Sequence, residues 1–183
     1  AIPTPTAIPT DAPTPTAIPM STLALQPTEG PRRSVVNWNT TGFTANSPIT
    51  ITYGPQDIQV VSSVTDAFGQ ASGTFQVPIN ASIPSSNRVS ATDSQGRNAI
   101  VAQTVPNASV SISHSEAPAG STVMVTGRDF PQLASLSSVT VGGLSALPEP
   151  APATDELGVF RMELWIPYQP AGIKSLYFSV QDS

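Results

Sequence analysis

The sequence predicts an all-β protein made of two tandem β-sandwich domains that follow an extended N-terminal segment. Turn signals recur about every 8 to 12 residues with no helical periodicity between them, which is typical of a sandwich. A turn and strand motif also occurs twice, at Thr65–Pro78 and at Thr154–Pro167. Its acidic residues, Asp66 and Asp155, lie 89 residues apart. A period of this length indicates tandem domains rather than a solenoid.

The N-terminal segment, residues 1–21, is rich in proline and threonine, which predicts an extended stalk or linker with threonines open to O-glycosylation. In residues 1–20 every proline is odd-numbered and every isoleucine and threonine even-numbered. In an extended strand alternate N–H groups point to opposite edges. Odd-numbered prolines therefore leave one edge able to pair, as in an edge strand. A duplicated Pro-Thr unit would produce the same alternation by accident. The face that would be buried carries Ile2, Ile8, Ile18 and Met20. The threonines open to O-glycosylation are Thr4, Thr6, Thr10, Thr14 and Thr16.

The first domain is expected over residues 22–106 and contains seven strands. Turn residues separate these strands, and Trp38 shares parity with Val36, which places it in the core. The expected strands are Thr22–Gln26, Ser34–Asn39, Ile49–Tyr53, Ile58–Val64, Gly73–Val77, Val89–Thr92 and Asn98–Val105.

The second domain, residues 107–183, repeats this order after a linker of only Pro106 and Asn107, so the domains should be closely coupled. At a constant offset of 89 residues, the end of the sequence aligns with Ser90–Ser94, and nothing corresponds to Asn98–Val105. The second domain is therefore expected to lack its last strand. The expected strands are Ser109–Ser113, Thr122–Thr126, Val139–Val141, Val159–Ile166 and Leu176–Val180.

Three stretches carry a resemblance to a known family. Pro118–Phe130 resembles the opening of bacterial IPT/TIG immunoglobulin-like domains, Pro27–Phe43 is a looser copy, and Ala91–Asn98 is similar to their late hairpin. The resemblance covers roughly residues 22–183 and implies immunoglobulin-like (Ig-like) sandwiches. In that broad class, secreted members are mostly adhesins, wall-anchored stalks, filament subunits and modules appended to enzymes. Fold analogy does not choose among these roles.

The missing strand predicts an open acceptor edge beside Leu176–Val180. At the same offset, Leu176, Phe178 and Val180 stand where the first domain has Asn87, Val89 and Ala91. An unpaired edge beside an apolar groove is a template for another chain. Trp165 and Tyr177 should point outward, where the first domain has Gln76 and Arg88. Single exposed aromatic residues are ordinary, but two near an incomplete edge favour an interface.

Enzymatic chemistry is not expected, and neither is a cofactor. His114 is the only histidine and there is no cysteine, so a transition-metal site lacks ligands. No Gly-x-Ser-x-Gly motif surrounds a serine, and the carboxylates are dispersed. Loop carboxylates such as Asp66 or Asp93 suit calcium, although a role in turns is the favoured interpretation. Three sequons offer possible N-glycosylation, at Asn39, Asn80 and Asn107.

Composition narrows the class of partner. Charged residues make up only 10% of the chain, so uncharged polar residues and proline must cover much of the surface, as in secreted cell-envelope proteins. The net charge of −5 and seven scattered basic residues argue against nucleic acid. No apolar run approaches the roughly 20 residues that cross a bilayer.

These observations favour an extracellular or cell-surface structural protein. In the first hypothesis, the chain polymerises into a filament because the N-terminal segment of one subunit pairs with the open edge of another. The second is an adhesin or carbohydrate-binding module on a Pro/Thr stalk, with Trp165 as a stacking platform. The third is a segment of a larger multi-domain surface protein.

Overall fold

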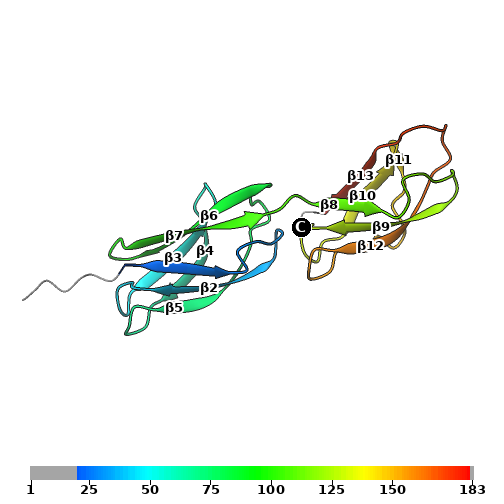
Figure 1. Ribbon diagram of the computed structural model, residues 1–183. Coiled ribbons are helices and arrows are strands. Elements are labelled where there is room, and N and C mark those ends of the chain that lie inside the picture. The colour runs from blue at the N-terminus through cyan, green and yellow to red at the C-terminus, as the bar shows by residue number, and fades with distance from the viewer. Residues whose placement is uncertain (1–19, 182–183) are drawn as a thin grey trace, which may run out of the picture.

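The computed structural model describes residues 20–181, which form thirteen strands and no helix. The all-β prediction is therefore confirmed. Figure 1 shows two bodies joined end to end, which we call the first half (residues 20–105) and the second half (residues 108–181). The predicted donor residues Ile2, Ile8 and Ile18 lie outside the described residues, as do all the threonines named for O-glycosylation.

The first half consists of two antiparallel sheets in the orders β1-β2-β5 and β4-β3-β6-β7. Its core lies between them, because inward side chains of both sheets, such as Trp38 and Tyr53, belong to one buried cluster. Alternating apolar residues build this core, since every second side chain of a strand points to the same face. The strands are β1 (Thr22–Gln26), β2 (Val35–Thr41), β3 (Pro48–Tyr53), β4 (Ile58–Val64), β5 (Ala71–Gln76), β6 (Ser85–Asp93) and β7 (Asn98–Val105).

Strand β7 covers one side of this core. It pairs with β6 along its whole length and buries Ala99 and Val105. Near its end it also reaches the chain that follows β1. The Thr104 N–H donates to the Thr28 carbonyl over 2.9 Å, and the Gly30 N–H donates to the Thr104 carbonyl over 3.0 Å. Strand β7 thus joins the two sheets and closes the gap between them.

The second half has two three-stranded sheets in the orders β12-β9-β8 and β11-β10-β13. Its own buried cluster includes Val125, Phe160 and Leu164 and shares no residue with the first. Strand β11 was not expected from the sequence. Within residues 108–181, no strand pairs with the outer edge of β13. The strands are β8 (Ser109–Ile112), β9 (Thr122–Arg128), β10 (Leu136–Val141), β11 (Leu144–Ser145), β12 (Phe160–Trp165) and β13 (Leu176–Val180).

The repeated Thr-Asp turn has the same bonds in both halves. Asp66 Oδ1 accepts the N–H groups of Phe68 and Gln70 over 2.8 and 2.9 Å. Asp155 Oδ1 accepts those of Leu157 and Val159 over the same two distances. The turn is therefore one structural unit that occurs twice.

The glycine of that turn is required in each half. Gly69 and Gly158 have φ of 71° and 70°. A Cβ atom would lie only 2.0 Å from the Phe43 carbonyl oxygen in the first half and 2.2 Å from that of Phe130 in the second. Any other residue would collide with backbone as well as strain its own conformation.

The fixed offset of 89 residues is wrong for the last strand. Tyr53 pairs with Val89, and the following Gly54 N–H donates to the Arg88 carbonyl. In the same way Val141 pairs with Leu176, and the Gly142 N–H donates to the Ser175 carbonyl. Leu176 therefore corresponds to Val89, not to Asn87. Likewise Tyr177 corresponds to Ser90 rather than Arg88. The counterpart of Ala91 is Phe178 instead of Val180.

The reason for the error is a shorter connection. Gln76 and Val89 are 13 residues apart, whereas their counterparts Trp165 and Leu176 are 11 residues apart. A shift of two residues leaves every side chain on its original face. The expectation that Leu176 and Phe178 face inward and Tyr177 outward is therefore unaffected.

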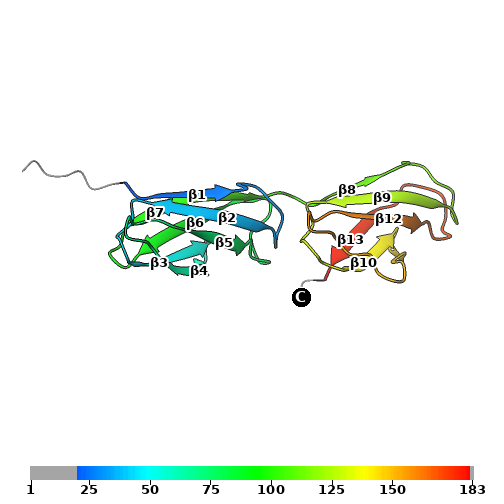
Figure 2. The same ribbon diagram turned by 90° about the horizontal axis from the view of Figure 1, so that it is seen from below.

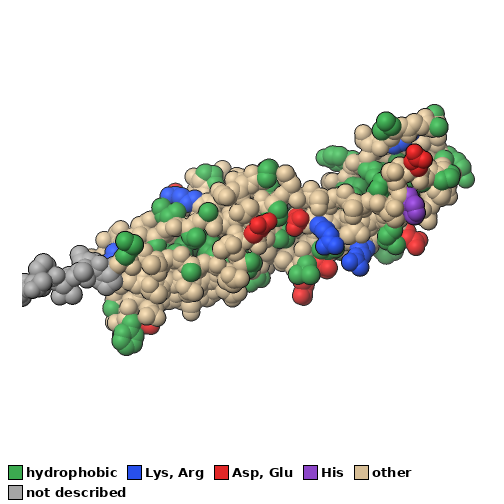
Figure 3. Space-filling view, in the orientation of Figure 1, with side chains coloured by type: hydrophobic (Ala, Val, Ile, Leu, Met, Phe, Trp, Pro, Cys, Tyr) green, Lys and Arg blue, Asp and Glu red, His purple; other side chains and the backbone are tan. Residues whose placement is uncertain are grey.

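The two halves are placed end to end. In the second half, β8 and β13 run in opposite directions. Figure 2 shows β8 running away from the first half and β13 running back toward it. The Gln132 N–H donates to the Arg32 carbonyl across the boundary over 3.2 Å. Strand β1 begins at the pole of the first half farthest from the second half (Figure 2), and the Met20 carbonyl, two residues before β1, is next to Gly42. The surface in Figure 3 shows charged side chains only singly or in small groups.

Candidate functional site

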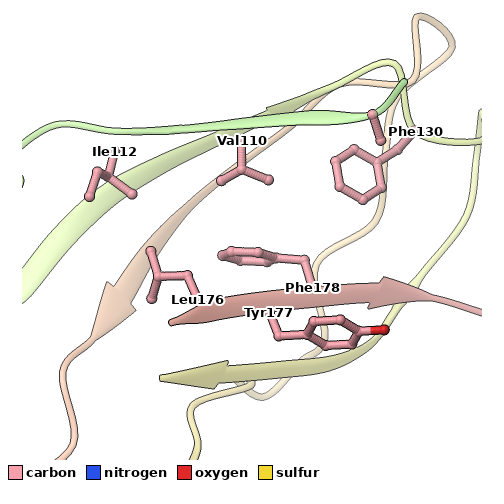
Figure 4. Close-up of a pocket in the computed structure, with 7 residues that line it drawn as sticks. Val110, Ile112, Phe130, Leu176, Tyr177 and Phe178 are labelled. Atoms are coloured by element: carbon pink, nitrogen blue, oxygen red, sulfur yellow. The ribbon is translucent and has the colours of Figure 1, made fainter. Parts of the chain in front are cut away.

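The most prominent site is an apolar groove in the second half between β8 and β13. Figure 4 shows Val110 and Ile112 extending from β8 toward Leu176 and Phe178 on β13, with Phe130 at one end. The cavity there measures about 400 Å³. It continues past Ile112 and Leu176 into a second hollow of about 710 Å³, whose lining includes Ile173. We call the two together the open groove.

Comparison of the halves shows what the groove lacks. Leu25 on β1 and Ile112 on β8 are counterparts, because they pair with Trp38 and Val125 at the same position of the neighbouring strand. Leu25 is 6% exposed and Ile112 is 38% exposed. Strand β7 lies beside β1 in the first half, whereas no described strand takes its place in the second. The open groove is thus the place that β7 occupies in the first half.

The groove offers backbone groups as well as apolar side chains. Inward-facing residues of β6, such as Val89 and Ala91, pair with β7. Their counterparts Leu176 and Phe178 have the same orientation on β13, and no described strand lies at that edge. Strand β8 likewise pairs on one side only, with β9. An extended chain would find two sheet edges and an apolar floor there.

The predicted interface residues do not all meet at this groove. Leu176, Tyr177 and Phe178 line it, although the Tyr177 ring points away from its interior (Figure 4). Val180 is half-buried and packs against the second core. Trp165 is 44% exposed but sits on β12, which β9 separates from β8. Met20, the one described member of the predicted donor set, is exposed.

Sequence reasoning missed the other wall of the groove. Val110 and Ile112 alternate with serines on β8, and Phe130 closes the end. The available signal was their match to Leu23 and Leu25 of the first half, at an offset of 87 rather than 89 residues. All four residues of β8 are exposed, so nothing within residues 20–181 buries its apolar side chains.

A second feature is an aromatic pair at the end of β12, the edge strand farthest from β8 in its sheet. The rings of Trp165 and Tyr168 are 6.0 Å apart between centroids and inclined at 72°. Both side chains are exposed. At this inclination the rings meet edge to face, and each carries an apolar body with a polar N–H or O–H group.

The two carboxylates named for calcium, Asp66 and Asp93, accept backbone hydrogen bonds within the fold, and those of Asp66 belong to the repeated turn. Asp93 is buried, and its two oxygens accept N–H groups from Thr44, Gln95 and Arg97. Burial opposes ionisation of Asp93, but these hydrogen bonds outweigh it and hold the pKa below the usual value. Hydrogen bonds from Val159 and Leu157 lower the pKa of Asp155 in the same direction. Among residues 20–181, no group of three His, Cys, Asp or Glu residues could hold a metal ion.

The remaining predicted positions lie on the surface. His114 is exposed, and its Nδ1 is 3.0 Å from the Ser113 hydroxyl. The sequon residues Asn39, Asn80 and Asn107 are all exposed, so each side chain is accessible to solvent. In the described part of the chain, no helix is long and apolar enough to span a membrane.

Comparison with known proteins gives limited similarity. No family model matches the sequence, and no curated protein matches it either. One similar solved structure is the crystal structure of a tetra-tandem repeat in the extending region of a large adhesion protein, with 14% identity and a TM-score of 0.36. The alignment covers 89% of this chain and 49% of that one, so the chain spans about half the length of that structure. The resemblance to IPT/TIG domains stays a prediction.

Proposed function

We propose that this protein is a subunit of an extracellular filament assembled by strand donation. Its two halves are tandem Ig-like domains, and residues 1–20 of one copy fill the open groove of another. The observation that carries this proposal is the groove itself, which lies where β7 completes the first half. The low content of charged residues supports an extracellular place of assembly.

The shape of the groove favours a strand as its occupant. The space runs between two sheet edges, each with unpaired backbone groups in the described structure. Backbone pairing with such an edge is an established way to bind an extended segment. The strand that fills the equivalent space, β7, has eight residues, so the occupant would extend over about 27 Å. The proposed donor, residues 1–20, is long enough to provide such a strand.

Chain direction favours another copy rather than the same molecule. Strand β7 is antiparallel to β6, so a replacement for it should run antiparallel to β13, away from the first half. A segment that runs in this direction leaves the groove at the tip of the second half. There it can continue into Met20 of a copy placed beyond that tip. The same molecule's segment would have to lie parallel to β13, because it precedes β1, which begins at the opposite pole (Figure 2). Head-to-tail donation does not close on itself and gives fibres.

Removal of the donor tests this function. A variant lacking residues 1–20 retains both buried clusters and should remain folded, but it should form no filaments by electron microscopy and sediment as a monomer. A synthetic peptide of residues 1–20 should then bind it with one-to-one stoichiometry. Filaments formed by the truncated protein would show that the segment is not the donor.

The Trp165–Tyr168 pair supports a second candidate function, a carbohydrate-binding or adhesive module. Exposed aromatic rings are suited to stacking on sugar faces. This function predicts glycan-array binding that Trp165→Ala abolishes, by a protein that stays monomeric. Glycan binding by a filament-forming protein would require both roles.

A longer surface protein is the third possibility, and its test is direct. The mass of the native protein, measured intact, should match the 183-residue chain with any attached glycans if the filament proposal is right. A much larger polypeptide would mean that a later part of the same chain is available to fill the groove.

A further inference from the structure

We infer that residues 11–18 of one copy take the place of β7 in the groove of the next copy, with Ile18 at the position of Val105. The junction between copies then repeats the junction between the two halves of one molecule. This inference rests on the proposed strand donation and adds to it the donated residues and their register.

The first argument is the distance along the chain to the next domain. In the described junction, Val105 ends β7, Pro106 follows, and β8 begins four residues after Val105, at Ser109. At the N-terminus, Pro19 follows Ile18, and β1 begins four residues after Ile18, at Thr22. Strands β1 and β8 are counterparts at an offset of 87 residues. Along the chain, residues 11–18 therefore precede the first half at the same distance at which β7 precedes the second half.

The second argument is the direction of the backbone hydrogen bonds in β7. The N–H and C=O of Thr104 point away from β6, toward Thr28 and Gly30. Because orientation alternates along a strand, the inward residues Ala99, Val101, Gln103 and Val105 point theirs toward β6. Ile100 and Ala102, like Thr104, are outward residues, whose backbone groups point away from β6. In the described structure no backbone group bonds to the N–H of either.

The prolines of the N-terminal segment fit this pattern position by position. In the inferred register, Pro13 and Pro15 replace Ile100 and Ala102, where no N–H is used. Ala17 replaces Thr104, the outward position that needs its N–H, and it is not proline. Thr14, Thr16 and the other even-numbered residues keep the N–H groups that face β13. In the second half, the partners of Ala17 would be the counterparts of Thr28 and Gly30, which are Ser115 and Ala117 at the 87-residue offset.

The side chain that the inferred register places at the position of Gln103 also suits the second half. Gln103 is fully buried in the first half, where it accepts a hydrogen bond from the Tyr53 hydroxyl. The counterpart of Tyr53 in the second half is Val141, which has no hydroxyl to satisfy. The inferred register places Thr16 there, so no long polar side chain enters a site that lacks a partner for it.

Two other registers satisfy the proline pattern and must be distinguished. Residues 5–12 would place Asp11 at the position of Thr104 and Ala12 at that of Val105, but Ala12 is ten residues from Thr22 rather than four. Residues 1–8 would place Ala7 at the position of Thr104 and Ile8 at that of Val105. Ile8 is 14 residues from Thr22, however, rather than four. Either register would separate neighbouring copies by a linker instead of repeating the described junction.

Two matched proline substitutions in the full chain separate these registers. Ala7 and Ala17 both lie in the sequence Thr-Ala-Ile-Pro, so their immediate neighbours are identical. Ala17→Pro removes an N–H used in the inferred register and should raise the critical concentration for filament assembly about tenfold. Ala7→Pro should leave it unchanged. The opposite result would overturn the inferred register and leave strand donation standing, and equal effects of the two variants would also overturn it.

Cysteine pairs give a positive test, because the chain has no cysteine of its own. Ser90 faces Ile100 in the first half, so Tyr177 should face Pro13 of the neighbouring copy. Outward residues form the closer, non-hydrogen-bonded pairs, with Cα atoms about 4.5 Å apart, within the range of a disulfide. Filaments of Pro13→Cys/Tyr177→Cys should therefore oxidise to a covalent ladder on denaturing gels, and those of Pro3→Cys/Tyr177→Cys should not.

The other outcomes are equally informative. A ladder from the Pro3→Cys pair alone would overturn the register but support donation. Cross-links only within monomers would show that the segment fills its own groove, which contradicts both proposals. Intact filaments without any cross-link from either pair would overturn the inferred register, and the variant lacking residues 1–20 would then decide whether the segment is donated at all.

Discussion

At the scale of single residues, the turn carboxylates determine local stability. Asp93 is buried and supports three backbone N–H groups. Asp93→Ala leaves these donors without a partner and should lower the free energy of unfolding by about 3 kcal/mol. Denaturant titration followed by tryptophan fluorescence measures this, because Trp38 lies in the same core. Asp155→Ala, at an exposed turn, should cost clearly less, and an equal cost would contradict the role of burial.

The same carboxylates set the response to acid. The pKa of Asp93 and of Asp155 is lowered in the folded protein, so both bind a proton more weakly there than in the unfolded chain. Their stabilisation is complete above the unfolded pKa of about 3.9 and is lost as pH falls through the lower folded values. The melting temperature should therefore fall below about pH 4. Asp93→Asn cannot titrate and should show a shallower fall, and an equally steep one would contradict this account.

At the scale of secondary-structure elements, the open edge of β13 can be filled within one chain. Replacing residues 181–183 with Ser-Gln-Gly-Arg and adding a copy of residues 11–18 would reproduce the β6–β7 hairpin of the first half, because Gln181 stands where the first half has Ser94. This variant should be monomeric and should not form filaments. It should also melt higher, by about 5 °C for each kcal/mol gained.

Light scattering and calorimetry measure these two properties. The matched control carries Thr14→Pro and Thr16→Pro within the appended copy, which removes the N–H groups that face β13. This control should still polymerise and show no gain in melting temperature. If both variants polymerise equally, the appended strand does not occupy the groove.

The strands were largely predictable from the sequence. Alternation and turn residues predicted β1, β4, β7 and β13 with the observed bounds. Strand β11 was missed because two residues carry no periodicity, and Pro148, Pro150 and Pro152 follow it closely. These prolines also explain why no long counterpart of β4 forms, since each removes an N–H from a possible ladder.

The site was predictable only in part. The missing partner of β13 followed from the repeat, but a constant offset misaligned Leu176 by two residues. The opposite wall at Val110 and Ile112 depends on how two distant strands meet across the core. Local sequence patterns do not contain that information, and it became visible only when β1 and β8 were compared in place.

At the scale of the whole molecule, few charges take part in the proposed assembly. The seven residues that line the smaller hollow are uncharged, and the larger hollow has only Glu116 and Lys174 as charged residues in its lining. The charged side chains visible in Figure 3 are scattered. Filament assembly should therefore change little between low salt and about 1 M salt, where charge interactions are screened within about 3 Å. Sedimentation across this range measures it. A steep loss of filaments with salt would indicate an electrostatic interface instead.

The path of the chain through the junction has a mechanical consequence. The chain leaves β7, crosses Pro106–Ala108 and enters β8 in the same direction along the long axis (Figure 2). If neighbouring copies are joined in this way, a pull on the filament draws each donated strand along its own length. Its backbone hydrogen bonds then share the load in shear instead of opening one after another. Such a fibre would resist tension although no covalent bond connects its subunits.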